Sequence, residues 1–142
     1  ARRINGERLV VLGWPRAILM QVAHPLIAAG VAEHSGFRST ALAPVQRLHA
    51  TVTAMLGLTF GTRAEQDRVV AHIRGIHDRV HGTLREHVGP CRAGTPYSAH
   101  DPALLLWVHA TLIDTSVLLF EAAVGPLTTA QRHQYCAESA PV

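Results

Sequence analysis

The stretch from Thr62 to Glu86 constrains the fold more than any other part of the sequence. It opens with Thr62 and Glu65 at the spacing of a capping box, and Gly82 near its end is a residue type that terminates helices. At about 100° per residue, its apolar side chains fall on one face of a helix of about five turns. The pattern predicts an amphipathic helix whose apolar face other helices must cover.

His77 lies inside that predicted apolar face, beside Ile73 and Val80, whereas His81 lies at its edge and His72 on the opposite side. An imidazole among apolar side chains needs a partner, because its nitrogens must be hydrogen-bonded, paired with a charge or bound to a metal. One interpretation is a core histidine bonded to a backbone carbonyl. The other is a ligand of a metal or of haem iron.

Composition places the chain among globular proteins, since 48% of its 142 residues are hydrophobic and 16% are charged. The chain has no lysine, and its arginines are scattered without interleaved aromatics, so a nucleic-acid surface is not predicted. Cys91 and Cys136 form neither CxxC nor CxxCH, which disfavours a zinc ribbon, a redox dithiol and a covalently attached c-type haem. With sparse cysteine and no leader in view, we expect a cytoplasmic location.

The rest of the sequence predicts further helices, with no strand pattern, and therefore an all-α chain in one domain spanning 1–142. Pro25 breaks the apolar run of 9–31, and residues 35–43 and 87–103 are expected to be loops. Polar residues within the apolar runs favour helices buried in protein over membrane spans. Helices are expected over 14–23, 26–34, 44–56, 102–124 and 127–138, in addition to the helix that begins at Thr62 and closes near Gly82.

Two local patterns suggest a site. His77 and His81 have the i, i+4 spacing of a helical zinc site, with Asp78 where the HExxH motif has glutamate. Arg47 and Thr51 lie one turn apart at the rim of an apolar stripe, where a cation and a hydroxyl could hold a carboxylate or propionate. A surface arginine lying over core methyl groups is the alternative for Arg47.

Four blocks of the sequence resemble, in order and spacing, the DUF2236 family, which contains the endoplasmic-reticulum-bound oxygenase of mycophenolic acid biosynthesis and the latex-clearing rubber oxygenases. The blocks are GWPRAILMQVAHPLIAAGVAEHSGF, PVQRLHATVTAMLGLTFGT, HIRGIHDRVHG and GTPYSAHDPALLLWVHATLIDT. The resemblance implies a globin-like helical bundle that holds a non-covalent b-type haem, and this chain looks like the N-terminal part of the longer family domain.

The resemblance also implies roles for individual residues. His77, preceded by Arg74, matches the proximal iron ligand, while Arg47 matches a haem-propionate or structural partner and Thr51 a residue near the distal pocket. Ala50 stands where the rubber oxygenases have a lysine, which argues against cleavage of polyisoprene. The family positions matched by His24, His109 and Asp114 have no assigned role.

The sequence thus leads to a first hypothesis of a haem-dependent oxygenase that uses O2 on a small hydrophobic substrate, with unsaturated molecules among the candidates. Glu33 or His34 is the candidate distal acid or base. A zinc-dependent hydrolase built on His77 and His81, and a helical ligand-binding or scaffold protein without chemistry, stay open as alternatives. Membrane association is not indicated.

Overall fold

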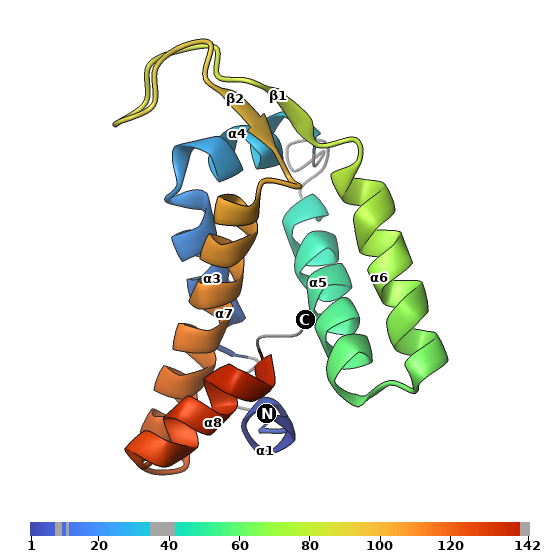
Figure 1. Cartoon of the computed structure of the whole chain (residues 1–142), viewed down its shortest axis with the longest axis vertical. Coiled ribbons are helices and arrows are strands. Elements are labelled where there is room, and N and C mark those ends of the chain that lie inside the picture. The colour runs from blue at the N-terminus through green and yellow to red at the C-terminus, as the bar shows by residue number, and fades with distance from the viewer. Residues whose placement is uncertain (8–9, 11, 35–41, 140–142) are drawn as a thin grey trace.

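The computed structural model describes residues 1–7, 10, 12–34 and 42–139. The described chain is predominantly α-helical, with one small two-stranded sheet, which confirms the prediction of an all-α chain (Figure 1). The helices are α1 (Arg2–Asn5), α3 (Trp14–Val22), α4 (Pro25–His34), α5 (Ala43–Phe60), α6 (Arg63–His77), α7 (Pro102–Ala123) and α8 (Thr129–Ser139). The strands β1 (His81–Thr83) and β2 (Pro96–Ser98) pair antiparallel.

Helix α7 lies along the long axis of the molecule, and α3 packs antiparallel against it (Figure 1). The interface carries polar contacts along its length. The Arg16 guanidinium donates to Thr115 Oγ1 at 2.7 Å, Gln21 Nε2 donates to Thr111 Oγ1 at 3.2 Å, and Trp107 Nε1 donates to the Met20 carbonyl at 3.2 Å. These bonds pair the buried hydroxyl groups of Thr111 and Thr115 on an otherwise apolar helix.

The starts of the helices follow the chemistry of the sequence. Thr62 and Glu65 form the predicted capping box, and the Asp101 carboxylate accepts from the Ala103 amide with Pro102 at the first helical position. Thr128 Oγ1 accepts from the Gln131 amide and so caps α8. Helix α5 continues through Gly57 to Phe60, so the prediction that it ends at Leu56 is wrong.

The prediction that one helix runs from Thr62 to near Gly82 is also wrong, because α6 ends at His77. Two tighter bonds, from the Arg79 amide to the Ile76 carbonyl and from the Val80 amide to the His77 carbonyl, close its last turn. The chain then enters β1, where Gly82 pairs with Tyr97.

Long-range pairing replaces the helix at this point. The Val80 carbonyl accepts from the Ala99 amide, and the Leu84 amide donates to the Thr95 carbonyl. A Cβ atom at Gly82 would lie 2.7 Å from the Tyr97 hydroxyl, so only glycine allows β1 to pass this close to the buried ring. The region 87–103, predicted as a loop, therefore includes a strand, and Leu84 is buried in the hairpin and not on a helix.

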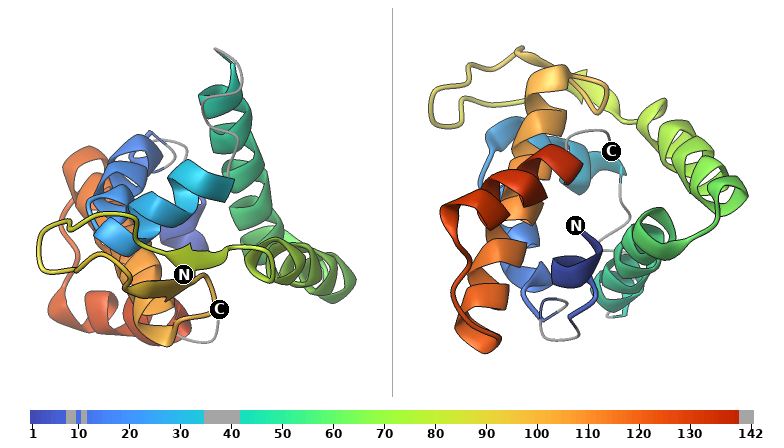
Figure 2. Two further views of the ribbon diagram at one scale, coloured as in Figure 1. Left: turned by 90° about the horizontal axis from the view of Figure 1, so that it is seen from above. Right: turned by 60° about the horizontal axis from the view of Figure 1, so that its bottom comes forward.

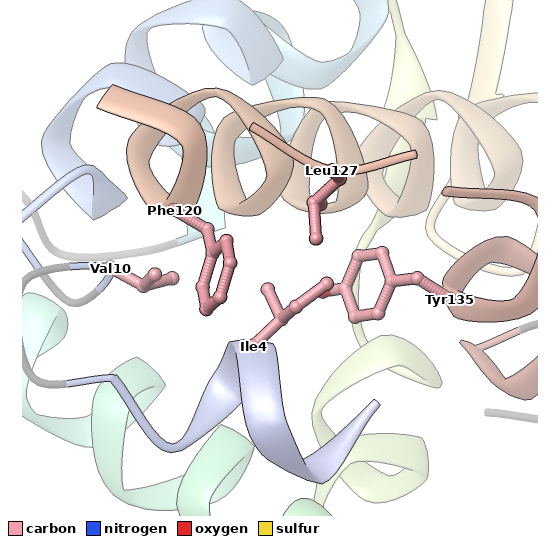
Figure 3. Close-up of a cluster of buried hydrophobic side chains, with 5 residues drawn as sticks. All are labelled: Ile4, Val10, Phe120, Leu127 and Tyr135. Atoms are coloured by element: carbon pink, nitrogen blue, oxygen red, sulfur yellow. The ribbon is translucent and has the colours of Figure 1, made fainter. Parts of the chain in front are cut away.

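The main apolar core lies at the opposite end of α7 from this hairpin. Figure 3 shows Phe120 of α7 facing Val10, with Ile4 of α1, Tyr135 of α8, and Leu127 from the segment between α7 and α8 beside them. The Tyr135 hydroxyl donates to the Asn5 side chain at 2.7 Å, so α8 and α1 are held by both packing and a hydrogen bond. The two ends of the chain are thus brought together against α7.

Helices α5 and α6 form a separate antiparallel pair beside this body (Figure 2). None of the described side chains of α5 or α6 is fully buried. Helix α7 is long and apolar enough to cross a bilayer, and 28% of its most apolar window is buried. The expectation that α7 is enclosed by protein therefore holds for only one side of the helix.

Candidate functional site

Antiparallel packing brings the predicted haem residues to one end of the α5/α6 pair. A Cβ atom at Gly57 would lie 3.1 Å from Cγ2 of Val69, which fixes the level at which the two helices touch. The two helices are antiparallel, so residues that precede Gly57 on α5 lie beside residues that follow Val69 on α6. Counted from this contact, Thr51 lies level with the turn that carries Arg74, just before His77. Residues distant in sequence therefore share one end of the pair.

The four predicted residues differ in exposure. Thr51 and His77 are half-buried, and Arg74 is exposed. Arg47 lies near the start of α5, at this same end, and its side chain is outside the described part of the structure.

His77 is the last residue of α6, and its ring packs edge-on against His100, with 5.9 Å between the ring centroids. Burial, and to a smaller extent the neighbouring His100, lowers the pKa of His77 below its ordinary value of 6.5. His77 is therefore neutral at pH 7, which is the form of histidine that binds a metal. Because His100 is in turn bonded to Asp78 through Nε2 at 2.8 Å, the ring that packs on His77 is itself anchored.

The zinc alternative loses its geometric basis. His81 lies in β1 and is exposed, so it does not share a helical face with His77. In the described part of the chain, no three His, Cys, Asp or Glu side chains are close enough together to hold a metal ion. The i, i+4 spacing in the sequence therefore does not correspond to a helical pair.

Glu33 and His34, the predicted distal acid or base, lie at the end of α4 against the β-hairpin. The Tyr97 hydroxyl donates to Glu33 Oε2 at 2.7 Å, Arg85 Nε bonds Oε1 at 2.8 Å, and the His34 ring is 3.3 Å from the same hydroxyl. The bond from Tyr97, and then Arg85, lower the pKa of Glu33, while burial and the adjacent carboxylate raise the pKa of Tyr97 to about 12. Glu33 is thus a carboxylate that joins α4 to the hairpin.

Three other polar residues of the sequence pattern have separate places. Asp114 lies at the surface, where Arg16 bonds its Oδ2 at 2.9 Å, so it belongs to the α3/α7 interface. His24 lies at the break between α3 and α4 beside Trp107, and its Nδ1 is buried without a hydrogen-bond partner among the described residues. Nε2 of His109 is likewise buried without a hydrogen-bond partner among the described residues.

His109 lines a partly open cavity of about 400 Å³ between the α5/α6 pair and the body of the molecule. The sequence placed His109 on an apolar helix but gave no sign of the cavity, because its walls come from both ends of the chain. The lining includes Trp14, Met55, Leu56, Leu112, Ile113 and Tyr135.

One observation indicates that the residues at the end of the α5/α6 pair are suited to bind an iron-containing group. His77 is an imidazole kept neutral by burial, and Arg74 and Thr51 lie at the same end of the two helices. A neutral imidazole is an axial ligand of haem iron, and arginine pairs with propionates. His77 and Arg74, with Thr51 and Arg47 on α5, are thus the residues that would hold a haem.

Comparison with known proteins gives a family match and two relatives. The model of the family described as "ER-bound oxygenase mpaB/B'/Rubber oxygenase, catalytic domain" matches residues 1–142. Uncharacterized proteins of Mycobacterium bovis and Mycobacterium tuberculosis are each 35% identical to the chain over 116 residues. The alignment covers 80% of this chain, which spans 42% of the length of each relative. No solved structure is significantly similar to the chain.

Proposed function

The chain belongs to the family of the ER-bound oxygenase mpaB/B' and rubber oxygenase catalytic domains, and on that premise we propose that it is part of a haem-dependent oxygenase. The substrates are O2 and a small hydrophobic, unsaturated molecule. Haem supplies the dioxygen chemistry that no side chain of this chain can perform. The protein binds and orients the substrate and excludes water from the site.

The observation that carries the proposal is the neutral, half-buried His77 at the end of α6. His77 would hold the iron, and the His100 ring packed on His77 restricts the orientation of the imidazole. Arg74 and Arg47 would pair with the carboxylates of the haem, and Thr51 would lie near the bound O2.

Glu33 and His34 are proposed as the distal acid or base. Their hydrogen-bond partners restrict how readily each can exchange a proton. The lowered pKa keeps Glu33 deprotonated at neutral pH, so it is a poor proton donor, and it also makes the carboxylate a weaker base. The hydrogen bond from Tyr97 already occupies one oxygen of its carboxylate, so His34 is the more available of the two.

The test is an absorbance spectrum of the full-length protein produced with haem available. We expect a Soret band that His77→Ala weakens strongly, because loss of the axial ligand lowers haem affinity. His72→Ala is the matched control, since His72 is exposed on the same helix and its loss should leave the band unchanged.

Three results would contradict the proposal. An unchanged Soret band in the His77→Ala protein removes His77 from the iron. Stoichiometric zinc without haem favours the hydrolase built on His77, and a colourless, metal-free full-length protein favours a ligand-binding or scaffold role.

A further inference from the structure

The cavity beside His109 is separate from the residues proposed to hold haem. It begins one turn beyond Thr51 on α5, at Met55, and extends towards α1 and α8, whereas His77 and Arg74 do not line it. At about 400 Å³ it falls within the range of sites that bind small molecules.

Its lining is mixed, with apolar side chains in a small majority. Nine of the sixteen described residues that line it are aliphatic or aromatic, among them Trp14, Met55, Leu56 and Leu112, and the polar ones come from α1, α5, α6, α7 and α8. Such walls favour an apolar ligand, because burying its surface is worth about 25 cal/mol for each Å².

His109 supplies an unmet hydrogen bond at this wall. Its Nε2 is buried and has no partner among the described residues, which costs free energy as long as it stays unpaired. The terminal torsion of a histidine side chain is soft, so the ring can turn a nitrogen towards a ligand in the cavity that His109 lines. A hydroxyl group suits either tautomer, because it both donates and accepts.

The charges in the lining select against an acid. Glu138 and the N-terminal ammonium of Ala1 both line the cavity and pair with each other, and no arginine is among the described residues that line it. A carboxylate ligand would therefore have to compete with Glu138 for that cation. We propose that this cavity binds a neutral, largely apolar alcohol whose hydroxyl is hydrogen-bonded to His109.

The test uses two probes of the same length, octan-1-ol and 1-chlorooctane, titrated calorimetrically into the full-length protein. We expect octan-1-ol to bind about ten-fold more tightly, because only the hydroxyl pairs with His109. His109→Phe keeps a ring of similar shape without its nitrogens and should abolish the difference, whereas His72→Phe at an exposed position should preserve it.

A spectroscopic readout covers the case in which His109→Phe disturbs the cavity. In the unmodified protein, octan-1-ol should shift the ¹⁵N resonance of His109 Nε2, and 1-chlorooctane should not. Equal affinity for the two probes, no binding of octan-1-ol, or an unshifted resonance would overturn the proposal.

This inference does not rest on the haem proposal, and the two fail separately. His77→Ala should weaken the Soret band and leave the binding of octan-1-ol unchanged. Competition between haem and octan-1-ol would overturn the assignment of a separate alcohol site, whatever the His77→Ala spectrum shows.

Discussion

Glu33 illustrates how one side chain can tie two elements together through its charge. Its carboxylate accepts from the buried Tyr97 hydroxyl and pairs with Arg85, so α4 and the hairpin share it. Folding lowers the pKa of Glu33 below its ordinary value of 4.5, with the hydrogen bond from Tyr97 as the largest cause. The carboxylate therefore stabilises the fold above about pH 4.5, and this contribution is lost as the pH falls through the lowered pKa.

We predict that Glu33→Gln lowers the free energy of unfolding at pH 7 and makes stability less dependent on pH between 7 and 3. Urea unfolding at a series of pH values measures both. Glu86→Gln is the control, because Glu86 is exposed in the hairpin loop. If the Glu33 variant followed the same pH profile as the unmodified protein, the bond to Tyr97 would contribute nothing to folding.

At the level of single residues, the sequence separated His77 from His72 correctly, whereas His81 lies in a strand and not at the edge of the predicted helical face. Helical periodicity places His77 on the apolar face, and it is half-buried, whereas the other two are exposed. The unpaired nitrogens of His24 and His109 could not be predicted, because a missing partner depends on what long-range packing brings near.

At the scale of elements, the contact between α3 and α7 depends on the absence of a side chain at Gly13. A Cβ atom there would lie 2.7 Å from Cγ2 of Thr115 and 2.8 Å from Cγ of Leu119. Thr115 is buried, with 1% of its surface exposed, so it cannot move away cheaply.

We therefore predict that Gly13→Ala lowers the free energy of unfolding by about 1–3 kcal/mol, the usual cost of overpacking. Gly75→Ala is the same substitution on α6 with nothing within 4 Å of the added atom. It should stabilise the protein by about 0.5–1 kcal/mol through helix propensity. Denaturant unfolding of the two variants compares them directly, and equal effects would contradict the close contact at Gly13.

The elements also show where periodicity misleads. Val80 and Leu84 continue the apolar face of α6 by spacing, yet they lie in a turn and a β-hairpin. Local pattern cannot detect the pairing of Gly82 with Tyr97, because that pairing joins distant segments. Caps and proline positions, which act locally, gave the starts of α6 and α7 correctly.

At the scale of the whole molecule, stability is distributed unevenly. Helix α7 buries Leu104, Thr111, Thr115, Ser116 and Phe120, whereas α6 has no buried residue. Segments with few buried contacts open more often.

We predict that backbone amides of α6 exchange hydrogen faster than those of α7 between Thr111 and Phe120, which native-state exchange followed by mass spectrometry measures. Helix α8, in which Tyr135 and Ser139 are buried and the other residues are exposed, serves as an internal comparison. Equal protection of α6 and α7 would mean that something else holds α6 in place.

The all-α class of the whole molecule followed from composition and periodicity, but the arrangement of the helices did not. Nothing in the sequence alone placed α1 and α8 together on α7, and the cavity beside His109 depends on that placement. The residues at the end of the α5/α6 pair were predicted from the family resemblance and not from the pattern of the sequence. In the structure, the antiparallel packing of α5 and α6 places them at the same end of the pair.

The hydroxyl contacts between α3 and α7 also determine where the chain can change length. Removing one residue between Thr111 and Thr115 would turn one of these two hydroxyls about 100° away from its partner on α3. The outer hairpin around Gly89 and Gly94 has open space around both glycines, so an inserted residue there displaces no packed group. Insertions and deletions are therefore tolerated in this outer loop and excluded from the middle of α7.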